Sequence, residues 1–211
     1  MKRIAIVGAG GFAREVLTLL LSIGGYEIIG FVTPDSSKAS INGYPIIGTD
    51  EEINRTKEPL NLVIAVGDPN LKKEIRLKYT NPLLSFPTLI HPSVIFGDRS
   101  MIIIGDGCII CAGTIITTNV AIEDFVTINL NCTVGHDARI SNYCSLMPSV
   151  NIAGEVHLGS SVYLGSGSNV INQIKIGENC IIGAGAVVVD DIPSGSTAVG
   201  VPAKPIKFHI R

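Results

Sequence analysis

The chain has 211 residues, a formal net charge of −2 and 46% hydrophobic residues, but only 5% aromatic residues and no Trp. This near-neutral charge argues against a nucleic-acid-binding protein, and no apolar run approaches the ~18 residues of a membrane span. Because aromatic residues are few, we expect a core of Ile, Val, Leu and Ala. The start MKRIAIVGAGG lacks the continuous apolar stretch of a signal peptide, so we expect a cytoplasmic protein.

The first 85 residues alternate between apolar runs and helical patterns. A strand is predicted in KRIAIV, a glycine-rich turn follows, and a helix begins near Phe12. Further strands are predicted at 27–32 and 60–67, and Thr49 and Asp68 are expected to cap the helices that follow them. This alternation predicts a small Rossmann-like parallel α/β domain over residues 1–85.

The glycine-rich turn contains Gly8, Gly10 and Gly11. Glycine lets the backbone approach a ligand, and the free N–H groups at a helix N-terminus suit a phosphate. The fingerprint G-x-G-x-x-G is incomplete because Ala13 takes its last position, and Thr33-Pro34 stands where a ribose-binding acid is expected. These departures disfavour an NAD-dependent oxidoreductase, and a tight turn without a ligand stays open beside a phosphate-binding turn.

From Ile104 to Val188 an aliphatic residue recurs every six positions, and a second small or apolar series lies two residues before each member. Side chains two residues apart point to the same side of a strand. The pattern is therefore neither helical nor a continuous strand, and it predicts a parallel β-helix over residues 86–211. Each hexapeptide would form one side of a coil, so a triangular coil would take 18 residues.

Five cysteines stand at 108, 111, 132, 144 and 180, and all except Cys111 fall on the inward series. The odd number argues against a disulfide framework, and no second C-x-x-C pair completes a zinc site. We expect these cysteines to be core residues.

His136 lies within NLNCTVGHDARISNYC, residues 129–144, at a predicted corner of its coil. A zinc site like that of the β-helical carbonic anhydrases needs three converging histidines, whereas His136 and His157 are 21 residues apart and fall in different columns. We therefore predict no metal site and keep a carbonic anhydrase as a distant alternative. A corner histidine that is not in the core is either solvated or catalytic.

The hexapeptide series and the closing VGVPAKPI (Val199 to Ile206) resemble the bacterial hexapeptide-repeat sugar acyltransferases, whose fold is a left-handed parallel β-helix. GAGGFAREV and IAVGDPNLKKEI extend the resemblance over nearly the whole chain. They point to the branch of the sialic acid O-acetyltransferase-like proteins, which includes N-acetyltransferases of nucleotide-linked 4-amino sugars. The resemblance implies acetyl-CoA as co-substrate and a homotrimer with active sites between subunits.

His136 is by this resemblance the general base that removes the proton of the attacking amine. The unperturbed pKa of an imidazole, ~6.5, suits that role. Asp137 is implied as the carboxylate that orients His136. Because adjacent residues of a strand point to opposite faces, their contact requires a turn conformation, and a solvent-facing acid is the alternative.

Other residues of the β-helix also acquire roles from the resemblance. Gly154, one coil beyond His136, is the implied backbone donor to the thioester oxygen. Ser166 and Ala184 would line the acetyl-CoA site. Ser145 stands where many members have a second histidine near the acetyl group, and serine donates a hydrogen bond but does not titrate near neutral pH. Asn129 is implied near the sugar amine, with a turn asparagine as the alternative.

In the first domain, the resemblance implies that Gly10, Gly11 and Phe12 line the nucleotide-sugar site and that Gly67 and Asp68 lie near the base. Aliphatic side chains on the outside of the β-helix, such as Ile103, Ile109, Ile115 and Ile181, are expected to bury against neighbouring copies.

Three functions therefore stay open at this point. The first is an acetyl-CoA-dependent N-acetyltransferase acting on a UDP- or dTDP-linked 4-amino-4,6-dideoxy sugar. The second is an O-acetyltransferase of sialic acid or another sugar. The third is a non-catalytic nucleotide-binding scaffold.

Overall fold

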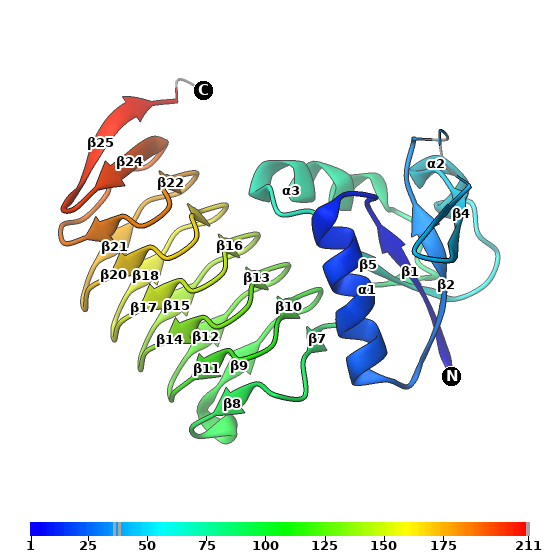
Figure 1. Ribbon diagram of the computed structural model, residues 1–211, viewed down its shortest axis with the longest axis horizontal. Coiled ribbons are helices and arrows are strands. Elements are labelled where there is room, and N and C mark those ends of the chain that lie inside the picture. Colours follow the sequence, from blue (N-terminus) through cyan, green and yellow to red (C-terminus); the bar gives the residue numbers. More distant parts are fainter. Residues whose placement is uncertain (36, 38, 210–211) are drawn as a thin grey trace. The chain divides into compact units, whose positions relative to one another are not determined.

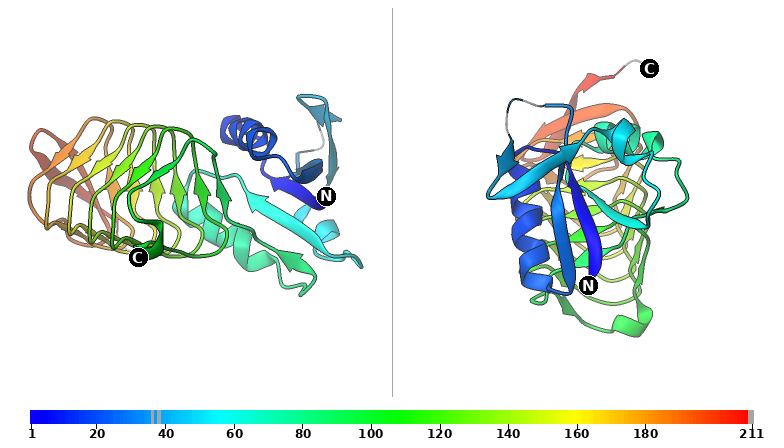
Figure 2. Two further views of the ribbon diagram at one scale, coloured as in Figure 1. Left: turned by 90° about the horizontal axis from the view of Figure 1, so that it is seen from below. Right: turned by 90° about the vertical axis from the view of Figure 1, so that its right-hand side faces the viewer.

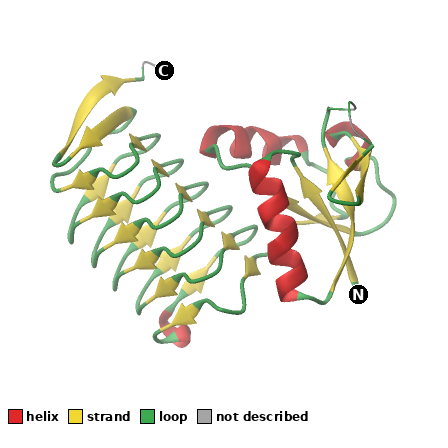
Figure 3. Ribbon diagram, in the orientation of Figure 1, coloured by secondary structure: helices red, strands yellow, loops and turns green. Residues whose placement is uncertain are grey.

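The computed structural model describes residues 1–35, 37 and 39–209 (Figure 1). The chain forms two compact units, Met1–Leu89 and the residues from Ile90 onward. Within the described residues, the α-helices lie in the first unit, and the second unit contains mostly two-residue strands and the 3-10 helix η1 (Arg99–Met101) (Figure 3). No helix of the described residues is long and apolar enough to cross a membrane.

The first unit contains a six-stranded sheet in the order β3-β4-β2-β1-β5-β6. Its strands are β1 (Lys2–Val7), β2 (Tyr26–Val32), β3 (Ser40–Ile41), β4 (Tyr44–Gly48), β5 (Leu60–Ile64) and β6 (Leu84–Ser85). All run parallel except β3, which pairs antiparallel with β4. The predicted Rossmann-like parallel α/β architecture is confirmed, and the loops after β1, β2 and β5 meet at one edge of the sheet.

Three helices, α1 (Gly11–Ile23), α2 (Asp50–Ile53) and α3 (Pro69–Lys78), connect these strands. α2 begins with a capping box between Thr49 and Glu52, and the Asp68 carboxylate accepts a hydrogen bond of 2.8 Å from the Leu71 N–H. Both predicted caps are thus confirmed, and they satisfy N–H groups that a helix start otherwise leaves without a partner.

The hairpin of β3 and β4 was not predicted. Its turn residues Asn42 and Gly43 both have positive φ, 46° and 84°, which is the geometry of a two-residue hairpin turn. The Asn-Gly pair in SINGYPIIG was the sequence signal for it.

The second unit is the predicted left-handed parallel β-helix, whose stacked coils are seen in Figure 2. One side is the sheet of β7 (Leu89–Ile90), β10 (Ile109–Ile110), β13 (Thr127–Ile128), β16 (Ser145–Leu146), β19 (Tyr163–Leu164), β22 (Ile181–Ile182), β24 (Ser196–Gly200) and β25 (Ala203–Phe208). The second side is formed by β8 (Ile95–Phe96), β11 (Ile115–Ile116), β14 (Thr133–Val134), β17 (Asn151–Ile152), β20 (Asn169–Val170) and β23 (Val187–Val188). The third side is formed by β9 (Ile103–Ile104), β12 (Ala121–Ile122), β15 (Arg139–Ile140), β18 (His157–Leu158) and β21 (Lys175–Ile176).

Neighbouring coils pair residues that are 18 apart, as in the register of Thr127 with Ser145 and of Ser145 with Tyr163. All members of the predicted inward series from Ile102 to Ala186 are buried, and so is the aliphatic series apart from the half-buried Ile104. The five cysteines are buried. The six-residue period therefore predicted both the coil length and the core.

The outward aliphatic residues follow the prediction with one exception. Ile103, Ile115 and Ile181 are exposed, whereas Ile109 is only 1% exposed. The expectation for Ile109 was wrong because its side chain is covered within the folded chain, and a hexapeptide position specifies only the direction of a side chain.

Each corner of the β-helix places one residue in the left-handed backbone region. From Gly107 to Gly185 every sixth residue has positive φ: Gly107, Gly113, Asn119, Phe125, Asn131, Asp137, Tyr143, Ser149, Glu155, Ser161, Gly167, Gln173, Asn179 and Gly185. Non-glycine residues adopt this conformation at a cost, so the stacking of the coils imposes it. This geometry sets the direction of the side chains around His136.

Candidate active site

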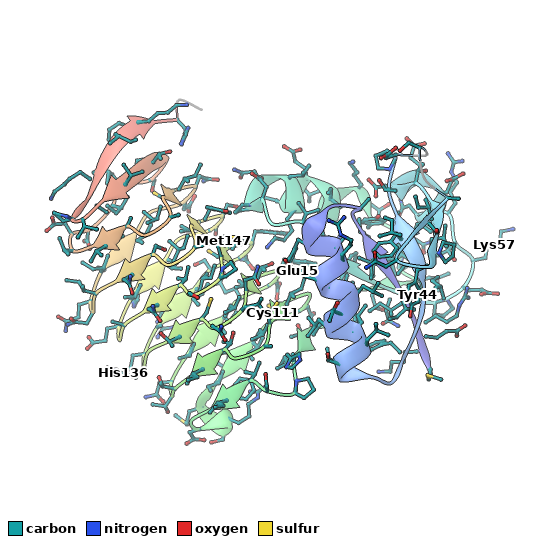
Figure 4. All side chains as sticks on the ribbon, in the orientation of Figure 1. Glu15, Tyr44, Lys57, Cys111, His136 and Met147 are labelled. Carbon is teal, nitrogen blue, oxygen red and sulfur yellow. The ribbon has the colours of Figure 1, made fainter. Side chains whose placement is uncertain are left out.

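His136 and Asp137 occupy the corner between β14 and β15, at the edge of the β-helix (Figure 4). The Nδ1 atom of His136 lies 2.8 Å from Oδ2 of Asp137. The left-handed φ of 59° at Asp137 turns the two adjacent side chains toward one another, which an extended strand would not do. The contact between His136 and Asp137 is therefore made, and it depends on the turn conformation that the sequence analysis required.

The Asp137 carboxylate has a second partner. Asn119, one coil earlier, donates from Nδ2 to Oδ1 of Asp137 over 3.2 Å. The hydrogen bond with His136, followed by that from Asn119, lowers the pKa of the Asp137 carboxyl below its ordinary value. Sequence reasoning missed Asn119, although its position 18 residues before Asp137 was a usable signal.

Gly154 lies one coil beyond His136, directly against the imidazole. A Cβ on Gly154 would stand 2.5 Å from Cε1 of His136, so a larger residue would push the ring away. Nδ1 faces Asp137 while Nε2 faces Gly154. A proton on Nδ1, held by the carboxylate, leaves Nε2 as a proton acceptor on the Gly154 side.

Gly154 is a buried residue, and its backbone N–H donates no hydrogen bond within the described part of the chain. At another corner of the helix the equivalent N–H groups of Asp106, Asp124 and Asn142 each donate to a carboxylate or amide side chain. Because it has no partner among the described residues, the Gly154 N–H is available as a donor to a ligand. The corner thus pairs a proton acceptor with an N–H donor on adjacent coils, whose backbones are spaced by about 4.8 Å.

Ser166 and Ala184 lie at a different corner, after β19 and β22 of the eight-stranded sheet. Both are exposed and stand on successive coils, so a long ligand can follow them along the helix axis. Asn129 follows β13 at this same corner. Because the sheet that contains β14 separates this corner from His136, one chain does not bring these residues together with the His–Asp pair.

Asn129 and Ser145 are both buried. The Oδ1 atom of Asn129 accepts a hydrogen bond of 2.7 Å from the N–H of Leu130, which is the role of a turn asparagine. Ser145 belongs to β16 and is fully buried. A substrate contact by Asn129 and a cofactor contact by Ser145 stay predictions.

In the first unit, the residues assigned to the nucleotide sugar gather at the carboxyl edge of the parallel sheet. Gly10 caps α1 without a side chain, and an added Cβ there would meet nothing within 4 Å. Gly11 and Phe12 form the first turn of α1, while Gly67 and Asp68 follow the neighbouring strand β5. Asp68 serves as a helix cap, so a role at the base would have to be shared with that structural one.

Among residues 1–35, 37 and 39–209, no group of three His, Cys, Asp or Glu side chains is arranged to hold a metal ion. His157 belongs to β18, away from the corner that holds His136. The two histidines thus stand in the different columns that their spacing of 21 residues indicated.

Comparisons with known proteins place the chain in a family. Residues 3–78 match the PglD N-terminal domain, and residues 155–190 match the bacterial transferase hexapeptide (six repeats). A GDP-perosamine N-acetyltransferase of Escherichia coli O157:H7 is 31% identical over 177 residues, covering 80% of this chain and 77% of that protein.

Two solved structures are similar along nearly the whole chain. The acetyltransferase domain of PglB from Neisseria gonorrhoeae FA1090 has a TM-score of 0.91 and 31% identity, covering 98% of this chain and 100% of that one. A histidine-to-asparagine mutant of perosamine N-acetyltransferase from Caulobacter crescentus, in complex with CoA and GDP-perosamine, has a TM-score of 0.90 and 32% identity, covering 98% of each chain. The chain is therefore an acetyltransferase that belongs to the bacterial hexapeptide-repeat sugar acyltransferases.

Proposed function

We propose that the protein transfers the acetyl group of acetyl-CoA to the amine of a nucleotide-linked 4-amino-4,6-dideoxy sugar, with His136 as general base. The observation that carries the proposal is the His136–Asp137 pair beside the unpartnered N–H of Gly154. The Neisseria domain is also known in complex with acetyl-CoA, and the Escherichia coli and Caulobacter relatives are named for GDP-perosamine.

The corner supplies both functions that acetyl transfer requires. Nε2 of His136 takes a proton from the sugar amine while the nitrogen of that amine forms a bond to the thioester carbonyl carbon. The N–H of Gly154 donates to the carbonyl oxygen as it becomes negatively charged. When the C–S bond breaks, the imidazolium returns the proton to the departing thiolate, and Asp137 stabilises that imidazolium. The products are the N-acetyl sugar and free CoA.

The nucleotide of the acceptor sugar is assigned to the first domain. We assign the nucleotide to the domain of residues 1–85, with Gly10, Gly11, Phe12 and Gly67 at its sheet edge and Asp68 near the base. A UDP or dTDP carrier is the prediction from the sequence. GDP joins these two as a candidate because the named relatives act on GDP-perosamine.

A homotrimer is the proposed assembly. Ser166 and Ala184 stand at a different corner from His136, so a second copy must supply them if the acetyl-CoA site contains both sets. Asn129 lies with Ser166 and Ala184 and would approach the sugar amine from that second copy. The exposed Ile103, Ile115 and Ile181 are apolar side chains that such an assembly can bury.

Release of free thiol from acetyl-CoA tests the activity. The acceptors are GDP-, UDP- and dTDP-linked 4-amino sugars and sialic acid, and each product is treated with mild base, which cleaves an ester but not an amide. We expect thiol release with one nucleotide-linked amino sugar and a base-stable product. A base-labile product would establish O-acetylation instead, and nucleotide binding without thiol release would establish the scaffold. Full activity in His136→Asn would remove His136 as the base.

A further inference from the structure

Three basic side chains stand side by side on the outside of the β-helix. Arg139, His157 and Lys175 occupy equivalent positions in β15, β18 and β21, and each pairs in register with the next. All three are exposed. We call Arg139, His157 and Lys175 the basic strip. The strip therefore places the two permanent cations, Arg139 and Lys175, two strands apart on one face, with His157 between them.

Two adjoining grooves, of about 570 and 670 Å³, are both lined by all three residues of the basic strip. The second groove also includes Asp137, the partner of His136. The strip is therefore continuous with the candidate active site, and a ligand bound at His136 can extend over it.

Acidic residues line the same grooves, but their carboxylates are engaged with other groups. Glu155 accepts from Nε2 of Gln173 over 3.3 Å, and Glu123 accepts from the N–H of Asn142 over 3.0 Å. Asp191 accepts from the backbone N–H of Lys175 over 2.7 Å. Asp137 is held by His136 and Asn119.

The basic side chains behave differently from these acids. Within the described residues, the side chains of the basic strip make no hydrogen bond and no ion pair within 4.0 Å. The groove thus offers charged donors that have no partner among these residues, next to carboxylates that each accept a hydrogen bond and keep their negative charge. The unpartnered guanidinium of Arg139 and ammonium of Lys175 are the groups in this groove that bind negatively charged oxygen atoms strongly.

We propose that the basic strip binds the phosphate groups of acetyl-CoA while the thioester lies against His136 and Gly154. Arg139 and Lys175 are two coils apart, about 10 Å at the spacing of paired strands, which suits phosphates at more than one position of a ligand. CoA carries a diphosphate and a separate 3′-phosphate, whereas a nucleotide sugar carries the diphosphate alone. This assignment rests on the proposed function, since acetyl-CoA is the substrate that the strip would hold.

Truncated acyl donors test the strip directly. The double variant Arg139→Gln/Lys175→Gln removes two charges and keeps the long side chains. We expect kcat/KM for acetyl-CoA to fall about tenfold or more, mainly through KM. The variant should use acetyl-dephospho-CoA with a smaller loss, and S-acetylpantetheine, which has no phosphate, as well as the wild type does. Arg55→Gln/Lys57→Gln removes the same two charge types from exposed positions of the first unit and should leave all three donors unaffected.

An equal loss with S-acetylpantetheine would overturn the proposal, because the strip would then be structural or would act on the reaction itself. A rise in KM confined to the nucleotide sugar would overturn it too, by placing the diphosphate of that substrate on the strip. Calorimetric titration with CoA alone separates this proposal from the proposed function. Weaker CoA binding in Arg139→Gln/Lys175→Gln would support the strip even if no acceptor sugar were acetylated, and unchanged binding would overturn it.

Discussion

The imidazole of His136 rests on the Cα of Gly154, one coil further along the β-helix, so closely that a Cβ on Gly154 would lie 2.5 Å from Cε1. Gly154 therefore has two separable roles in the proposed reaction. Its missing side chain leaves the space that the ring occupies, and its N–H, which has no partner among the described residues, would donate to the thioester oxygen. Any residue with a side chain at position 154 would displace the His136 ring from Asp137.

Gly154→Ala should displace the imidazole and lower kcat by about 100-fold, because a small misplacement of a catalytic group is costly. Gly154 does not have positive φ, so alanine fits its backbone and the unfolding free energy should change little. A double-mutant cycle with His136→Ala checks the cause. In the His136→Ala protein, Gly154→Ala should lower kcat little further. A fall in kcat as large as in the wild type would mean that Gly154→Ala does not act through the position of the His136 ring.

Substitutions at Asp137 should separate activity from stability. Asn tolerates the φ of 59° found there and Ala does so less well, so Asp137→Ala should lower the unfolding free energy by about 1 kcal/mol more than Asp137→Asn. Both should lower kcat at least about tenfold, because neither holds the proton on Nδ1 of His136 as a carboxylate does. Urea unfolding and steady-state kinetics measure the two effects. Wild-type kcat in Asp137→Asn would contradict the orienting role.

The pKa of Asp137 offers a test that needs no substrate. Hydrogen bonds from His136 and then Asn119 lower it, so its titration by carboxyl NMR should fall below the ordinary ~3.9. Asn119→Gly keeps a backbone that accepts positive φ and should move the pKa part of the way back, while His136→Asn should move it further.

The sign of the linked stability follows from the direction of the Asp137 shift. A lowered pKa in the folded state contributes stability that is present above the ordinary pKa and is lost as the pH falls through the folded one. The unfolding free energies of wild type and Asn119→Gly should therefore differ at neutral pH and converge as the pH falls below about 4. A difference that persisted unchanged down to the lowest pH would point to another cause.

The cysteines should be unreactive in the native protein. All five are buried, and burial raises the pKa of the Cys132 thiol to about 11, so hardly any thiolate forms near neutral pH. A thiol reagent at pH 8 should label none of them until denaturant unfolds the β-helix, and then all five. Rapid labelling of Cys132 in native buffer would show that its coil opens.

The success of the sequence at predicting the β-helix has a simple physical reason. Each inward residue stands at the same point of an identical turn, so the period alone determined that Cys132, Val134 and Cys144 are core residues. The contact of His136 with Asp137 was harder to predict from the sequence, because the side chains of these adjacent residues meet only when Asp137 adopts positive φ. Asn119 lies one coil before Asp137, so its place in the site could be predicted only after the length of a coil was known. The burial of Ile109 depends on what covers the outside of the sheet, and a repeat does not encode that.

The proposed homotrimer leads to a test by complementation. If His136 of one copy works with Ala184 of another, His136→Asn and Ala184→Trp should each abolish activity as pure proteins, the first by removing the base and the second by filling the acetyl-CoA path. When the two are unfolded together in equal amounts and refolded, mixed assemblies contain some sites with both intact residues, and about one quarter of the wild-type activity should return. Light scattering at micromolar concentration should give the mass of three chains. A monomer by scattering, or a trimer without complementation, would remove the shared site.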